Sequence, residues 1–200
     1  MLLAVLGSSV AMAQTAVEEL QKMLNTTQSM QANFKQTVFN EKLMQIQTAS
    51  GTMAYKKPNL FKWQVIEPDA TLLITDGKKL WNYDVALEQV TVQKYTIDKE
   101  ISPLSFILDD ASHINADFNV EQQANDCFKL TPKQENSNFA NVSVCFANAS
   151  GTAKIKSLAV LDHLGQTSLF EFSKMQVNIP LATASFSFTP PAGVDVVGEP

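Results

Sequence analysis

The feature that most constrains the fold is a two-residue alternation of apolar and polar side chains, which begins near residue 34. Phe61, Trp63 and Val65 would share one face of an extended segment, and the lysine and glutamine between them the other. The same alternation recurs over residues 80–84. Because successive side chains of a strand point to opposite faces, this period predicts strands with one buried face.

Turn residues divide this region into short segments suited to antiparallel pairing. The strongest hairpin signal is Asp76-Gly77, because an Asp-Gly pair favours the two-residue turns that join antiparallel strands. A sheet of this length tends to curl and to present a concave apolar face. Further strands are expected at Phe128, Val142, Ile155, Ala159, Phe170 and Val177, and a last one at Phe186-Ser-Phe188, before a proline stop and a loose tail.

Two amphipathic segments are expected to cover the concave face as helices, which makes the fold class α+β. Thr15-Ala-Val-Glu18 has the spacing of a capping box and predicts a helix that ends by Met30. A second, short helix is predicted over Ser102–Ile114, with a further turn near Ala111, because Ser-Pro suits a helix start. On the first helix, one face carries Val17, Leu20, Met23, Leu24 and Thr27.

The first thirteen residues predict a secretory signal peptide. Residues 1–13 carry no charge, include an apolar run and end in Ala11-Met12-Ala13, which fits a small-x-small cleavage pattern. We therefore expect the mature chain to begin near Gln14 and residues 14–200 to form a single domain. The alternative is that residues 1–13 form a buried strand or helix.

Charge limits the classes of partner. The formal net charge is −5, and every basic residue is a lysine. This balance disfavours nucleic acid as a partner. The lack of arginine also disfavours recognition of phosphate or carboxylate by a planar two-pronged donor.

Two cysteines in an exported chain permit one disulfide. Folding a hairpin about Asn136 places Cys127 opposite Cys145, so a cross-strand disulfide is predicted. The alternative is a pair of buried, reduced thiols. With two thiols and two distant histidines, no metal site and no cofactor are expected.

No catalytic motif stands out, so the chain is not expected to be an enzyme. It lacks the fingerprints of serine hydrolases, zinc proteases, P-loop proteins and dinucleotide-binding proteins. His113 is expected to be structural, and His163 is expected to be an exposed residue of a turn. Asp109 and Asp110 diverge if they are helical, which suits a solvated helix end better than an acid-base pair.

Three segments together resemble the family of outer-membrane lipoprotein carrier proteins, LolA. The first is Phe34-Lys-Gln36 after an amphipathic helix. The second runs from Gly51 through Lys-Pro-Asn-Leu-Phe-Lys-Trp63 and Glu67-Pro-Asp69 to Asp76-Gly-Lys-Lys-Leu-Trp81-Asn-Tyr-Asp84. The third is Phe186-Ser-Phe-Thr-Pro-Pro-Ala-Gly-Val194. The resemblance spans nearly the whole predicted mature chain.

This resemblance implies an unclosed β-barrel with a lid of short helices over a hydrophobic cavity. It implies a periplasmic, monomeric chaperone that carries acylated lipoproteins from the inner-membrane LolCDE transporter to the outer-membrane receptor LolB. By analogy, Leu20 and Leu24 lie on the first lid helix. Leu104, Ile107 and Leu108 then lie on the second helix, and Phe34, Phe61 and Trp63 on the cavity wall. Ordinary core packing is the competing interpretation of these residues.

Lys57 departs from the family pattern. Members commonly have arginine before this proline, where it links the barrel to the lid through hydrogen bonds to carbonyls. An ammonium donates without the fixed fork of a guanidinium, so a looser lid latch is expected at Lys57.

Three other assignments compete with the carrier. LolB shares the implied fold but requires cysteine at its cleavage site, where this chain has Gln14. The second is a lipid- or hydrophobe-binding module of another envelope pathway. The third is a hydrolase that uses Asp109, Asp110 or His163.

Overall fold

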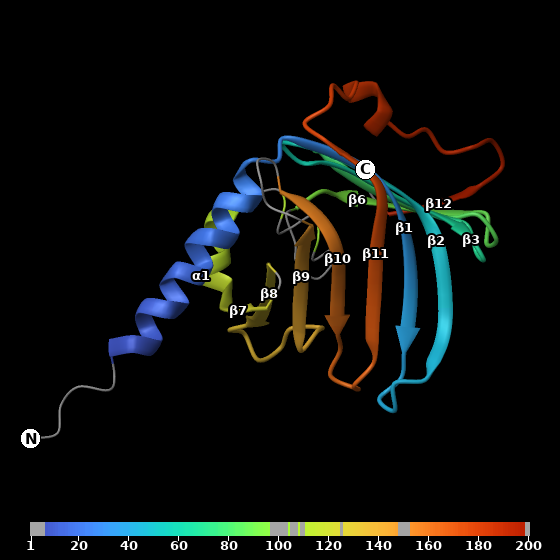
Figure 1. Ribbon diagram of the computed structural model, residues 1–200. Coiled ribbons are helices and arrows are strands. Elements are labelled where there is room, and N and C mark those ends of the chain that lie inside the picture. The colour runs from blue at the N-terminus through green and yellow to red at the C-terminus, as the bar shows by residue number, and fades with distance from the viewer. Residues whose placement is uncertain are drawn as a thin grey trace, which may run out of the picture.

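The computed structural model describes residues 7–96, 104, 108, 111–124, 126–147 and 153–198, with side chains from residue 16 onward. Within them, a single twelve-stranded sheet curls without closing, and the helix Gly7–Asn25 and the helical residues 111–117 lie to one side of it (Figure 1). The α+β class and the curled antiparallel sheet predicted from the alternation are confirmed, as is the unclosed barrel that the resemblance implies. Within the part of the chain described, no helix is long and apolar enough to cross a membrane.

The strands pair in the order β12-β6-β5-β4-β3-β2-β1-β11-β10-β9-β8-β7. All neighbours are antiparallel except β12 and β6, which are parallel. The strand bounds are β1 Ser29–Phe39, β2 Gln45–Lys56, β3 Leu60–Glu67, β4 Thr71–Asp76, β5 Lys79–Asp84, β6 Gln89–Lys94, β7 Phe118–Gln123, β8 Cys127–Pro132, β9 Asn141–Ala147, β10 Lys154–Leu161, β11 Thr167–Val177 and β12 Asp195–Val197.

The helices are α1 (Gly7–Asn25), η1 (Ala111–His113), α3 (Ile114–Asp117) and η2 (Thr183–Phe186). The first helix ends before Met30 as predicted, but it begins at Gly7 and not at the capping box, because the residues before Thr15 continue the helix. The turn predicted near Ala111 is η1. Leu104 and Leu108, in the predicted second helix, are helical.

The last predicted strand is wrong. Phe186 ends the short helix η2, and Phe188 lies in extended chain outside the sheet. The tail instead returns to add β12 beside β6, where the Asp195 N–H donates to the Glu88 carbonyl at 2.9 Å. Alternation alone did not distinguish a strand from a segment that packs on the outside of the sheet.

The face of the sheet that is buried changes along the sheet, from the inner face at β3 to the outer face at β5 and β6. Trp63 and its pairing partner Leu73 are partly buried and pack against the main core on the inner face. Ile74 pairs with Lys62 and Trp81, so these side chains point to the opposite, outer face. There a second cluster forms around Trp81 and Val90, and the tail covers it with Phe188, whose ring centroid is 6.3 Å from that of Trp81.

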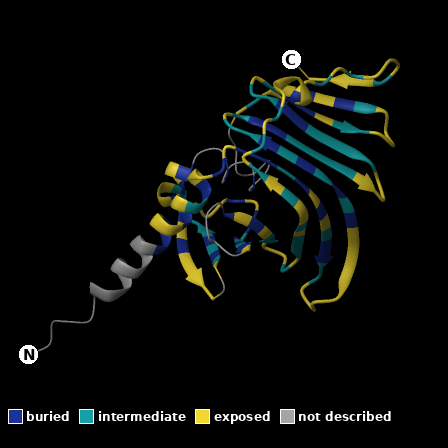
Figure 2. Ribbon diagram, turned by 45° about the horizontal axis from the view of Figure 1, so that its top comes forward, coloured by how far each residue is buried: buried dark blue, intermediate teal, exposed yellow. Residues whose placement is uncertain are grey.

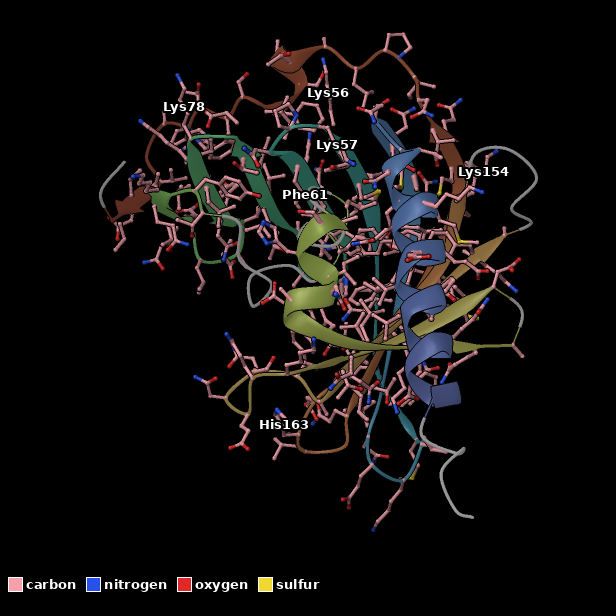
Figure 3. The ribbon with its side chains drawn as sticks, turned by 90° about the vertical axis from the view of Figure 1, so that its left-hand side faces the viewer. Lys56, Lys57, Phe61, Lys78, Lys154 and His163 are labelled. Carbon is pink, nitrogen blue, oxygen red and sulfur yellow. A yellow bond between two sulfur atoms is a disulfide. The ribbon has the colours of Figure 1, made fainter. Side chains whose placement is uncertain are left out.

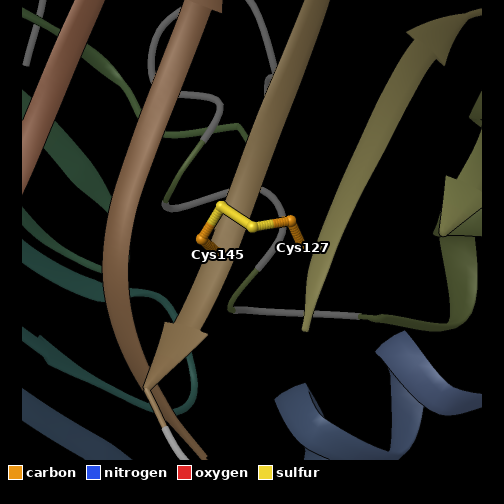
Figure 4. Close-up of a disulfide and its surroundings, with 2 residues drawn as sticks. All are labelled: Cys127 and Cys145. Carbon is orange, nitrogen blue, oxygen red and sulfur yellow. A yellow bond between two sulfur atoms is a disulfide. The ribbon is translucent and has the colours of Figure 1, made fainter. Parts of the chain in front are cut away.

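The predicted disulfide is present between Cys127 and Cys145, with an S–S distance of 2.08 Å (Figure 4). The two cysteines are direct pairing partners on β8 and β9, as the hairpin prediction requires. Phe128 and Val144, which pair next to them, are fully buried in the main core. The disulfide therefore fastens the two strands at a place where their inner faces form the core.

We expect the double substitution Cys127→Ala, Cys145→Ala to lower the free energy of unfolding by about 3 kcal/mol, because the bond closes a loop of 18 residues in the unfolded chain. Urea unfolding of the oxidised protein and the variant measures this difference. Dithiothreitol should lower the stability of the oxidised protein to the variant's value and leave the variant unchanged. Equal midpoints for both proteins without reductant would contradict the prediction.

Candidate functional site

The candidate site is the inner, concave face of the sheet together with the helices packed against it. Figure 2 shows buried residues concentrated where the sheet faces the helices, and exposed residues on the hairpin ends. The main core contains residues from α1, from the second helical region and from the inner faces of most strands. The site is therefore apolar and is formed by segments distant in the sequence.

Five aromatic rings form the centre of this inner face. The Phe34 ring on β1 stacks on Trp63 of β3 with 3.9 Å between ring centroids. Phe170 of β11 meets the Trp63 ring edge-on at 5.3 Å, and Phe172 does so at 6.4 Å. The Phe61 ring lies 6.3 Å from that of Trp63. The structure thus brings the three predicted wall residues together and adds two from β11.

The close approach of these rings depends on Gly51 of β2, which pairs with Phe34. A Cβ atom at Gly51 would lie 1.9 Å from the Gln64 carbonyl oxygen and 2.7 Å from the Phe34 ring. Both contacts are shorter than atoms tolerate, and the first is with backbone. Glycine is therefore required at this point of the wall.

Four predicted lid residues are buried in the same core. Leu20 and Leu24 of α1 have 0% and 1% of their surface exposed, and Leu104 and Leu108 have 3% and 1%. Ile107 lies outside the described residues, as do Asp109 and Asp110. The helices also bond to one another, since Gln21 Nε2 donates to the Ala111 carbonyl at 2.8 Å.

Tyr55 links the sheet to the second lid helix. Its hydroxyl donates to the Leu108 carbonyl at 2.7 Å, and its side chain is 1% exposed. The sequence analysis missed this residue, although its place on the same face as Met53, in a strand of strict alternation, was a usable signal. The role of Lys57 as a lid latch stays a prediction, because much of the lid segment that its side chain would reach lies outside the described residues. Its backbone N–H donates to the Gln28 carbonyl at 2.9 Å.

Part of the inner face is not fully covered. The fully buried residues lie under the helices, whereas other inner residues are only partly buried and pack against the core's margin. Figure 3 shows Phe61 among the side chains between the sheet and the helices. An apolar surface therefore continues from beneath the lid to solvent through Trp63, Val65, Leu73, Val160, Phe170, Phe172, Met175 and Val177.

His163, one of the three residues of the hydrolase alternative, lies in the turn between β10 and β11, beside Asp162. The Asp162 carboxylate accepts hydrogen bonds from the backbone N–H groups of Leu164 and Gln166, both at 2.8 Å. The His163 Nε2 atom is 2.7 Å from the Ser137 carbonyl oxygen. These contacts fix the turn, which agrees with the structural interpretation of His163.

A curled sheet with an apolar inner face, partly open and partly covered by helices, is the architecture of a protein suited to hold hydrophobic ligands. The family described as "Outer membrane lipoprotein carrier protein LolA" matches residues 25–189. The chain therefore belongs to the LolA family of outer-membrane lipoprotein carrier proteins.

Curated relatives agree with this assignment, and a solved structure shares the fold. The chain is 37% identical to the outer-membrane lipoprotein carrier protein of Proteus mirabilis, over 97% of this chain and 93% of the relative. It is 34% identical to that of Dechloromonas aromatica, over 92% and 88%. A LolA superfamily protein from Nitrosomonas europaea shares the fold with a TM-score of 0.54 at 13% identity, over 88% of this chain and 98% of that one.

Replacing Gly51 with alanine should destabilise the protein by about 1–3 kcal/mol, the usual cost of overpacking a core. The new methyl group would displace either the Gln64 carbonyl or the Phe34 ring. Chemical denaturation measures the loss, with Ser50→Ala on the opposite face as the control. Equal stability of the two variants would show that the wall relaxes freely.

The substitution Tyr55→Phe should loosen the lid, because it removes a buried hydrogen bond that contributes about 1 kcal/mol. Hydrogen exchange of the backbone amides in residues 111–117 should become faster. Tyr83→Phe makes the same chemical change in the outer cluster and should leave that exchange unaltered. Identical protection in both variants would argue against Tyr55 as a latch.

Proposed function

We propose that the chain is a periplasmic carrier that holds the acyl chains of lipoproteins against the inner face of its sheet. The observation that carries this proposal is the partly buried apolar surface that extends from beneath the lid to solvent. Family membership supports the assignment, and the relatives' names identify lipoproteins as their cargo.

Transfer free energy explains why such a carrier is needed. Each methylene group moved out of water gains about 0.8 kcal/mol, so an acylated protein does not cross an aqueous gap unaided. The aromatic cluster around Trp63 offers a broad apolar surface for these chains. A hydrocarbon tail makes no hydrogen bonds or other directional contacts, so one apolar surface can bind the acyl chains of many different lipoproteins.

The lid explains how cargo is released. Leu20, Leu24, Leu104 and Leu108 pack against the core in the structure, so incoming acyl chains compete with the protein's own side chains. Opening the lid costs free energy, and this cost lowers the net affinity for cargo. We place LolCDE as the donor of cargo and LolB as the acceptor, in keeping with the family pattern. No covalent step is required.

The proposal is tested by loading purified protein with an acylated lipoprotein released from inner membranes that contain the transporter. Wild type should form a soluble one-to-one complex, and a lipoprotein without acyl chains should not bind. Phe61→Glu should disturb uptake or release at least tenfold, because a carboxylate in the apolar wall opposes the hydrocarbon. Val160→Glu, at a partly buried position, repeats the test with less risk to folding.

Leu87→Glu is the matched control, since Leu87 is 71% exposed on a hairpin and outside the core. Normal transfer by both inner-face variants would contradict the proposed site. If wild type captures free lipid but no acylated protein, the chain is instead a lipid-binding module of another envelope pathway.

A further inference from the structure

A groove lies on the outer face of the sheet, opposite the apolar inner face, and the proposed binding of acyl chains does not involve it. It encloses about 500 Å³ and lies between the convex side of β1, β2, β3 and β11 and the C-terminal segment. This volume falls in the range of ligand-binding clefts. Its lining is mixed: Gln31, Asn33, Thr52 and Gln176 contribute polar side chains, and Ala54 and Leu181 contribute apolar ones.

The charges in this groove have one sign. Lys62 of β3 and Lys174 of β11 line it, and none of the other described residues of the lining carries a charge. A third ammonium lies at its border, where Lys56 Nζ donates to the Leu181 carbonyl at 2.7 Å (Figure 3). The chain as a whole carries a net charge of −5, so this positive surface runs against the overall balance.

Lys174 reaches the outer face because of a backbone irregularity. Phe172 and Met175 both pack against the inner core, so strict alternation would turn Lys174 inward as well. Instead, the pairing of β1 with β11 shifts between Gln31 and Asn33, and Lys174 has a φ of 51°. Such a conformation costs a residue with a side chain about 1 kcal/mol. Bulges of this kind re-aim a side chain, here into the groove.

The opposite wall is held firmly. The Ser29 hydroxyl donates to the Ile179 carbonyl at 2.6 Å, and Phe186 at the end of η2 is fully buried. The groove floor also has a fixed side-chain contact, because Gln31 Nε2 donates to Gln176 Oε1 at 2.6 Å. The groove is therefore formed before any ligand arrives.

From these observations we propose that the outer groove binds an acidic, extended segment of another polypeptide. Lys62 and Lys174 stand on strands separated by three inter-strand spacings, about 14 Å. Carboxylates four residues apart on an extended peptide lie about 13 Å from each other and on one side of the chain. The carboxamides of the lining supply both donors and acceptors for the peptide backbone.

The test uses a fluorescein-labelled peptide with two glutamates separated by three serines, titrated against the full chain and followed by anisotropy at low salt. We expect saturable binding that weakens as salt is added. Lys62→Gln and Lys174→Gln should each weaken it about two- to fivefold, and the double variant about tenfold. The same peptide with lysines in place of glutamates should not bind.

Lys78→Gln is the matched control, because it removes one charge at an exposed position outside the groove and should leave the affinity unchanged. Equal weakening by Lys78→Gln would show that only the net charge matters and would overturn the proposal. Unchanged binding by the double variant would also overturn it. So would displacement of the peptide by an equimolar concentration of inorganic phosphate, which would mark a simple anion site.

Discussion

The structure depends on the need to cover the apolar inner face of the sheet. The protein's own helices and a bound apolar ligand compete for this face. Leu20 and Leu108 occupy it from two helices distant in sequence. The sheet supplies the surface, and its failure to close leaves room for a cover that is separate from the barrel. A sealed barrel would bury the same residues permanently and would have no use for a lid.

Polar contacts determine how firmly that cover is held. The Tyr55 hydroxyl reaches the carbonyl of Leu108, and Gln21 joins the first helix to Ala111. Each is a single neutral hydrogen bond, whose net contribution is small beside that of the buried leucines. Hydrophobic packing therefore provides most of the closure, while the hydrogen bonds fix the position in which the lid closes.

Local patterns in the sequence predicted the curled sheet, the helical cover and the disulfide, because alternation, helical spacing and hairpin symmetry all act over short ranges. The path of the tail was not predictable in this way. Phe186 and Phe188 alternate like a strand, yet Phe186 ends the short helix η2 and Phe188 covers the cluster around Trp81 on the outer face. Lys174 was missed for a related reason, since a bulge leaves no mark in the alternation.

The change of the buried face, from inner to outer toward β5 and β6, limits how far the apolar inner surface extends across the sheet. On β5 and β6 the residues Trp81, Tyr83, Val90 and Val92 point outward. Leu80 faces inward at the start of β5, but beside Leu73 the inner positions hold Asn82 and Thr91, which pair with each other and are exposed to solvent. An acyl tail that spreads sideways past Leu73 meets amide and hydroxyl groups there in place of further apolar contacts. The inner face of the carrier thus changes from apolar to polar at this border, and the border separates the part of a lipoprotein that the sheet can shelter from the part that stays in water.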